Sequence, residues 1–214
     1  MVDVQGRTVR AADTREVILS AAEQLYAELG VFAVSNRQVS EAAGQGNNAA
    51  VGYHFGTKTD LVRAIVCKHA AAVDALRTEM LTDTVGSTDL RDWLSCLVRP
   101  SMDHLSELGN PTWYARFSAQ ILTDPTLRSI IDEHALASPS LNMTLAGLER
   151  CTPTLPEAVR AARRDMARTL VIHVIADRER FFATSAGSKD ADWTAVSNDL
   201  VDALCGLWSA PVTR

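Results

Sequence analysis

Apolar residues recur at steps of three and four along most of this chain, which is the period of an amphipathic helix and not of a β-strand. The first such run predicts a helix over residues 13–30, with carboxylates at its start and Gly30 at its end. No segment shows the alternation expected of paired strands, so the pattern predicts an all-α fold. The apolar face of the first helix carries Ile18, Ala21, Ala22, Leu25, Tyr26 and Leu29.

Two short helices are predicted directly after this one. Ser35 stands three residues before Gln38, the spacing at which a hydroxyl and an amide cap a helix start reciprocally. After a glycine turn, Asn47 or Asn48 caps a second short helix over residues 49–54. The three helices close a small core in a helix-turn-helix arrangement, which many proteins use to enter the major groove of DNA. The alternative is a packed three-helix unit that binds no DNA.

The remainder of the chain is expected to form a larger helical unit. Thr57 and Asp60 repeat the capping arrangement at the start of a long helix, and prolines mark two later helix starts. About nine helices are expected in all. Those of the larger unit cover residues 58–82, 89–108, 156–182 and 192–209, with two more starting at Asn110-Pro111 and Asp124-Pro125, the second interrupted near Pro139.

The composition is that of an ordinary cytosolic protein, with 47% apolar residues, 22% charged residues and a net charge of −5. Residues 1–12 are polar and are expected to be a disordered arm rather than a signal peptide. No apolar run reaches the roughly 18 residues of a membrane span. The four cysteines lack a CxxC motif or a histidine at metal-ligand spacing, which favours reduced thiols. We expect a cytoplasmic protein with no membrane contact, no metal and no cofactor.

Residues 30–61, and above all the block YHFGTK from Tyr53 to Lys58, resemble the N-terminal DNA-binding domain of the TetR/AcrR family of bacterial transcriptional regulators. The resemblance covers residues 13 to about 66. Gly52 departs from it, because the family pattern has a large aromatic there. The resemblance implies a DNA-binding domain over residues 13–56 and a helical ligand-binding and dimerisation domain over residues 57–214.

Charge adds little to this picture, because residues 1–58 contain five Lys or Arg against six Asp or Glu. Contact with a DNA duplex must therefore come from individual hydrogen-bond donors rather than from a basic surface. We expect phosphates at Ser35, Arg37, Tyr53, His54 and Lys58, where helix N-termini add backbone N–H groups. We expect base edges at Asn47, Asn48, Ala49 and Ala50, since an amide pairs with adenine and a methyl group contacts that of thymine. For the two asparagines the alternative is helix capping alone.

The last two helices each carry an apolar stripe. Both stripes either pack on their own chain or, as the resemblance implies, pair with those of a second copy in a four-helix dimer interface. The stripe residues are Val159, Met166, Leu170 and Val174 on the first of these helices and Trp193, Val196, Leu200, Leu204, Leu207 and Trp208 on the second.

The resemblance also implies a small-molecule effector, and hence a repressor that binds a palindromic double-stranded DNA operator as a homodimer and is released by ligand. One alternative is an all-helical enzyme, because His173 and Asp177 stand one helical turn apart. Another is a constitutive DNA-binding protein without ligand. From periodicity, the candidate ligand-pocket residues are Trp93, Met102, His104, Trp113, Phe117, Ile121 and His173, each of which is alternatively a core residue.

Overall fold

The computed structural model describes residues 4–47, 49–184 and 191–213, and these residues form ten helices and no strand. The all-α prediction is confirmed. No helix within these ranges combines the length and the apolar character needed to cross a bilayer.

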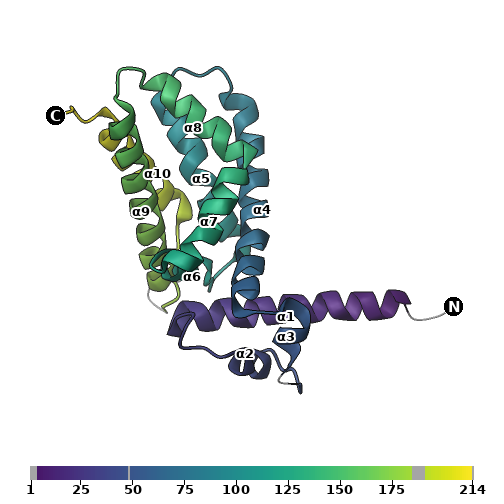
Figure 1. Ribbon diagram of the computed structural model, residues 1–214. Helices are drawn as coiled ribbons and strands as arrows, with labels where there is room; N and C mark the ends of the chain where they lie inside the picture. Colours follow the sequence, from purple (N-terminus) through teal and green to yellow (C-terminus); the bar gives the residue numbers. More distant parts are fainter. Residues whose placement is uncertain (1–3, 48, 185–190, 214) are drawn as a thin grey trace.

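The N-terminal unit consists of α1 (Val4–Leu29), α2 (Asn36–Ala42) and α3 (Ala50–Phe55), and it forms the foot of the molecule (Figure 1). The long helix α4 (Lys58–Thr84) rises from this foot into the upper bundle. The capping box predicted for Thr57 and Asp60 is present at its start, with the Thr57 N–H and the Asp60 carboxylate 3.0 Å apart. Because this capping box fixes the first residue of α4, it also helps to fix the direction in which α4 extends from the N-terminal unit.

The N-terminal arm is where the structure first differs from the sequence prediction. Residues 4–12, expected to be disordered, continue α1, whereas residues 1–3 lie outside the described residues. This stretch contains no proline, and its alanine and arginine residues favour a helix, so nothing local stops α1 from extending toward the N-terminus.

The upper bundle contains the remaining helices, with α9 and α10 side by side at the edge away from α4 (Figure 1). A break at residues 138–139 raises the number of helices from about nine to ten. Ser138 caps the helix that follows by accepting a hydrogen bond from the Leu141 N–H, and Pro139 cannot continue the helix before it. The bundle helices are α5 (Leu90–Leu108), α6 (Tyr114–Leu122), α7 (Pro125–Ala137), α8 (Pro139–Cys151), α9 (Glu157–Phe182) and α10 (Trp193–Ser209).

Two hydrophobic clusters form the core, and the boundary between them does not follow the predicted domain boundary. One cluster joins α1, α2, α3 and the start of α4 to α6 and α7, with the rings of Tyr26 and Phe117 stacked 6.3 Å apart. The other joins α5, α8, α9 and α10 to the end of α4. Because α6 and α7 share this cluster with the N-terminal unit, a movement of either helix changes the packing of that unit.

The close approach of α8 to α5 depends on Gly147. A Cβ atom added there would lie 2.1 Å from the ring of Trp93, which is 1% exposed and donates its indole N–H to the Ser87 carbonyl. We expect Gly147→Ala to lower the free energy of unfolding by about 1–3 kcal/mol, as overpacking does elsewhere. Urea denaturation measures this loss. Gly52→Ala is the matched control, because nothing lies within 4 Å of its added Cβ, and equal stability of the two variants would contradict the prediction.

Candidate nucleic-acid interface and central cavity

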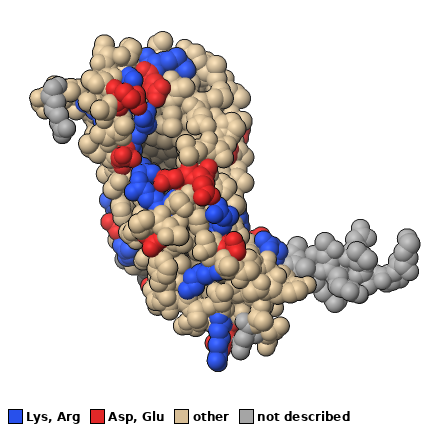
Figure 2. All heavy atoms as spheres, viewed as in Figure 1, with Lys and Arg blue, Asp and Glu red and all other residues tan. Residues whose placement is uncertain are grey.

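The N-terminal end of α2 and the outer side of α3 expose most of the predicted DNA contacts. Ser35, Arg37, Asn47, Ala49 and Tyr53 are all exposed, and Tyr53 is exposed to 84%. Figure 2 shows charged side chains of both signs interspersed over the viewed face, in keeping with the absence of a basic surface in the sequence. Contact with a duplex must therefore come from these few local groups.

Local hydrogen bonds hold the two ends of this exposed surface. The predicted capping box at α2 is confirmed, since Ser35 Oγ accepts from the Gln38 N–H at 3.2 Å and Gln38 Oε1 accepts from the Ser35 N–H at 2.8 Å. Before α3, Asn47 Oδ1 accepts from the Ala49 N–H at 2.9 Å. A bidentate contact with adenine needs that oxygen, which this bond occupies. The bond closes a turn just before α3 and does not cap it, because the N-cap residue is Ala49 and has no side-chain cap. Asn48 lies outside the described residues.

Ala50, predicted to contact bases, is 7% exposed and packs in the core beside Val51, so the structure does not support that contact. A helix of six residues has a single outer side, and here that side consists of Ala49, Gly52 and Tyr53. Gly52 was missed, although its position three residues after Ala49 indicated a shared face. Its missing side chain leaves room for close approach of a partner.

Lys58 has a different role from the predicted phosphate contact. Its ammonium donates to the carbonyl oxygens of Val31 and Val34, at 3.0 Å and 2.5 Å. Lys58 therefore ties the start of α4 to the loop between α1 and α2. These two contacts join Lys58 to residues that lie 27 and 24 positions earlier in the chain. Helical periodicity does not reveal contacts at such separations.

His54 is half-buried, and its main chain anchors α3 to α1. Arg15 donates to the His54 carbonyl at 2.5 Å and lies over the ring of Phe55, 4.2 Å from its centroid. Such a cation–π contact adds to the hydrogen bond. Arg15 thus sets the orientation of the exposed side of α3.

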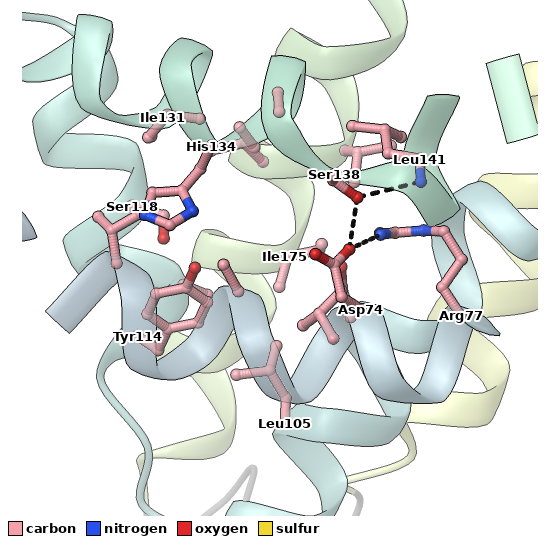
Figure 3. Close-up of a pocket in the computed structure, with 18 residues that line it drawn as sticks. Asp74, Arg77, Leu105, Tyr114, Ser118, Ile131, His134, Ser138, Leu141 and Ile175 are labelled. Atoms are coloured by element: carbon pink, nitrogen blue, oxygen red, sulfur yellow. Dashed lines mark hydrogen bonds and ion pairs between the residues drawn. The ribbon is translucent and has the colours of Figure 1, made fainter. Parts of the chain in front are cut away.

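A central cavity of about 210 Å³ lies among the helices from α4 to α9 (Figure 3). The viewed side of the molecule is hollowed among the upper helices (Figure 2). The walls of the central cavity are mainly aliphatic, and several side chains supply polar groups. The aliphatic lining comprises Val66, Ala70, Val73, Leu105, Ala115, Ile131, Ala135, Leu141, Val171, Ile172 and Ile175, and the uncharged or ionisable polar lining includes Ser101, Tyr114, Ser118, His134 and Ser138, besides the pair Asp74 and Arg77.

The polar groups gather at two ends of the cavity (Figure 3). At one end, Asp74 Oδ1 accepts from Arg77 at 2.8 Å, from Ser138 at 2.7 Å and from Ser140 at 2.8 Å. Burial lowers the pKa of Arg77, which the nearby Asp74 charge opposes. At the other end lies Tyr114, whose pKa is raised to about 12 by burial. An aliphatic cavity with a few placed polar groups is the form of a small-molecule site.

None of the seven predicted pocket residues lines this cavity, so the cavity does not support that prediction. Apolar periodicity marks the inner side of a helix, but it does not separate contact with another helix from contact with a void. The missed signal was Asp74 with Arg77, two charged residues on the inner side of α4. In the structure, Trp93, Met102, Phe117 and Ile121 are buried core, Trp113 is half-buried against the N-terminal unit, His104 bonds to His69, and His173 is exposed.

The apolar stripes of α9 and α10 differ in how much of them is exposed. On α10, five of the predicted interface residues are at most 8% exposed and pack within their own chain, so they offer little surface to a second copy. On α9, Met166 and Leu170 are 53% and 37% exposed. The buried α10 residues are Trp193, Val196, Leu200, Leu204 and Trp208, whereas Val159, Val174 and Leu207 are half-buried.

The pair His173 and Asp177, considered for an enzyme, does not form an enclosed site. Both residues are exposed on α9, and Asp177 pairs with Arg180 at 2.6 Å. The described residues contain no cluster of His, Cys, Asp and Glu suited to a metal ion.

Comparisons with known proteins agree with this architecture. Residues 18–65 match the family described as "Bacterial regulatory proteins, tetR family", and residues 95–206 match "Tetracyclin repressor-like, C-terminal domain". No curated protein sequence matches. The TetR family regulator PfmR from Thermus thermophilus has a similar fold, with a TM-score of 0.54 and 15% identity over 93% of this chain and 97% of that one.

A further similar structure is the TetR-like regulator LfrR from Mycobacterium smegmatis in complex with proflavine, with a TM-score of 0.46 and 19% identity over 94% of this chain and 98% of that one. The match to the C-terminal domain spans residues 95–206, which is half of the chain. Together with the helix-turn-helix match, it assigns a DNA-binding regulator rather than an enzyme. The chain belongs to the tetR family of bacterial transcriptional regulators.

Proposed function

We propose that this regulator is a cytoplasmic repressor that binds a palindromic operator as a homodimer and leaves it when a small molecule occupies the central cavity. The observation that carries the proposal is the position of α4. This helix contributes Val66, Asp74 and Arg77 to the cavity wall, and its first residue, Lys58, holds the loop between α1 and α2. Ligand and DNA therefore act on the same rigid element, which is what reciprocal coupling between two sites requires.

The proposed DNA contacts follow from exposure. Phosphates meet Ser35 and Arg37 at the N-terminus of α2 and His54 in the last turn of α3, while Ala49, Gly52 and Tyr53 face the groove. Asn47 contributes through its amide nitrogen, and Asn48 keeps its sequence-based assignment as a base contact. A palindrome places two such surfaces about 34–36 Å apart or a multiple of this distance, which requires a dimer.

The proposed effector is a small, mainly apolar molecule with polar groups near its ends. This character follows from the aliphatic walls of the cavity and from the polar groups at its two ends, which include Asp74 and Tyr114. Such a ligand buries its apolar part while its polar groups replace water.

The test of the proposal begins with selection of bound duplexes from a random-sequence pool by the purified protein. Recovered duplexes should contain an inverted repeat, and affinity should fall steeply as salt rises, because phosphate contacts release counterions. A compound that raises the melting temperature should then lower affinity for the selected duplex. Ligand stabilisation without any change in DNA affinity would favour constitutive binding, and failure to select a duplex would contradict DNA binding.

Arg37→Ala should weaken binding of all duplexes and reduce the slope of log affinity against log salt by about 0.9, the value for one phosphate contact. Arg37 is free to turn toward a phosphate, since its partner Glu41 is 51% exposed. Fluorescence anisotropy at several salt concentrations measures the slope. Arg128→Ala is the matched control, because Arg128 also pairs with a carboxylate four residues later, on α7. Identical slopes for the two variants would remove Arg37 from the interface.

Leu170→Asp should convert the dimer into a folded monomer that no longer binds the palindrome. Met166 and Leu170 give α9 an exposed apolar surface that a second copy could cover, and a charge at Leu170 opposes its burial. Light scattering gives the mass and circular dichroism the helix content. Leu204→Asp, which charges the buried face of α10, should instead unfold the chain. A dimeric Leu170→Asp protein would place the interface elsewhere.

A further inference from the structure

A buried chain of three ionisable side chains connects the N-terminal unit to the upper bundle. Glu23 of α1, His69 of α4 and His104 of α5 are 7%, 2% and 6% exposed. His69 Nε2 lies 2.8 Å from Glu23 Oε2, and His69 Nδ1 lies 2.7 Å from His104 Nε2. Each of the three helices therefore contributes one member to a continuous hydrogen-bonded chain.

This chain touches the central cavity through one side chain. The ring of Tyr114 stacks on the His69 imidazole, with centroids 3.8 Å apart and an interplanar angle of 17°. Tyr114 itself lines the cavity (Figure 3), whereas Glu23, His69 and His104 do not. A change in cavity occupancy that moves the Tyr114 ring therefore acts on the imidazole that holds Glu23.

The two hydrogen bonds are compatible with two arrangements of the chain that differ by one proton. With Glu23 ionised, His69 Nε2 must carry a proton to donate. His69 Nδ1 then either accepts from His104, which leaves His69 neutral, or donates to His104, which makes His69 an imidazolium. Only the second arrangement gives the buried carboxylate a full counter-charge. The other charged or titratable groups that act on this chain are Lys68, which pairs with Glu16 at 2.6 Å, and Tyr114.

We propose that Glu23, His69 and Tyr114 are positioning residues that transmit the state of the cavity to α1, and thereby to the DNA-binding unit. A buried hydrogen-bonded charge is either well paired or strongly unfavourable, so a small displacement at Tyr114 is converted into a shift between two arrangements. The effect on DNA rests on the proposed function, whereas the mechanical link from Tyr114 to α1 does not.

A double-mutant cycle tests the link without a ligand. Tyr114→Leu removes the ring that stacks on His69, and Tyr114→Phe keeps the ring and removes only the hydroxyl. Glu23→Gln keeps the shape of the side chain and removes its charge. We expect Tyr114→Leu to weaken binding of the selected duplex by at least about fivefold in the parent protein, which is the lower range of allosteric couplings. In the Glu23→Gln background, Tyr114→Leu should change duplex affinity less than about twofold. Tyr114→Phe should leave duplex affinity unchanged both in the parent protein and in the Glu23→Gln background.

The control for a general effect of cavity size is Leu141→Ala, which enlarges the cavity from α8, a helix that contributes no member to the chain. Its effect on affinity should be the same with Glu23 and with Gln at this position. Equal effects of Tyr114→Leu in both backgrounds would overturn the proposal. If Glu23→Gln does not fold, His69→Gln serves as the second background, with the same expectation.

Backbone hydrogen exchange and imidazole ¹⁵N chemical shifts test the link independently of DNA. Relative to Tyr114→Phe, Tyr114→Leu should raise the exchange rates of the α1 amides of residues 15–29 by at least about fivefold and shift the His69 nitrogens. Unchanged exchange and unchanged shifts would refute the link even if a duplex binds. Changed exchange with no duplex recovered would leave the link standing and reject the proposed function.

Discussion

Glu179→Ala is expected to lower the free energy of unfolding by about 3–5 kcal/mol, the range for removing one partner of a buried charge pair. Glu179 is 1% exposed and reaches from α9 to the start of α6, where the N-cap residue Trp113 supplies no side-chain cap. Its carboxylate accepts from the Ala115 and Arg116 N–H groups at 3.1 Å and 2.9 Å, from the Arg116 guanidinium at 3.0 Å and from the Thr112 hydroxyl at 2.7 Å. Its removal takes the acceptor from the two backbone N–H groups and the Thr112 hydroxyl, and leaves the Arg116 guanidinium only its bond to the Thr112 carbonyl.

Urea denaturation measures the loss, and two further variants separate its causes. Glu179→Gln keeps one acceptor oxygen but removes the charge, so it should fall between Glu179→Ala and the parent. Asp177→Ala removes a carboxylate from an exposed position of the same helix and should leave stability unchanged. A Glu179→Ala protein as stable as Asp177→Ala would show that α6 does not depend on this carboxylate.

Stability is expected to fall by about 3 kcal/mol more than the carboxylates alone predict as the pH is lowered from about 6.5 to about 4. Burial, followed by the charge on His69, lowers the pKa of His104 to about 4, from about 6.5 in the unfolded chain. Between these values the unfolded chain binds a proton that the folded chain does not, so acid favours unfolding. Above pH 6.5 the imidazole is neutral in both states and adds no pH dependence.

Denaturation curves at pH 4.5, 5.5, 6.5 and 7.5 isolate this contribution when variants are compared. His104→Gln should lose the additional acid sensitivity, because an amide does not titrate. His173→Gln should retain it, because His173 is exposed on α9. Parallel stability curves for the two variants over the whole range would contradict the assignment to His104.

The helix boundaries near the candidate DNA-binding surface were predictable because they depend on neighbours in the chain. Ser35 with Gln38 and Thr57 with Asp60 form the expected capping boxes, and each bond joins residues three apart. The extra helix start at Pro139 follows from the same local chemistry, since Ser138 caps α8 and a proline at this position favours a new start over an interruption. Residues 4–12 continue α1 although they are polar, because polar composition does not exclude a helix.

The cavity and the packing of α10 were not predictable for a different reason. A period of 3.6 residues identifies which side of a helix is apolar, but not what covers it. Leu200 and Leu204 are covered by their own chain, whereas Leu170 remains 37% exposed. The difference depends on where α5 and α9 lie relative to α10, which no window of sequence contains.

The all-α class, the caps of α2 and α4 and the family of regulators could all be predicted from residue types at fixed short spacings. The folded chain was needed to see that Lys58 ties a loop, that Glu179 caps α6 and that His69 joins Glu23 to His104. These contacts join residues at least 24 positions apart. The energy of such a contact depends on the distance and burial that packing produces, and residue identities alone do not specify either quantity.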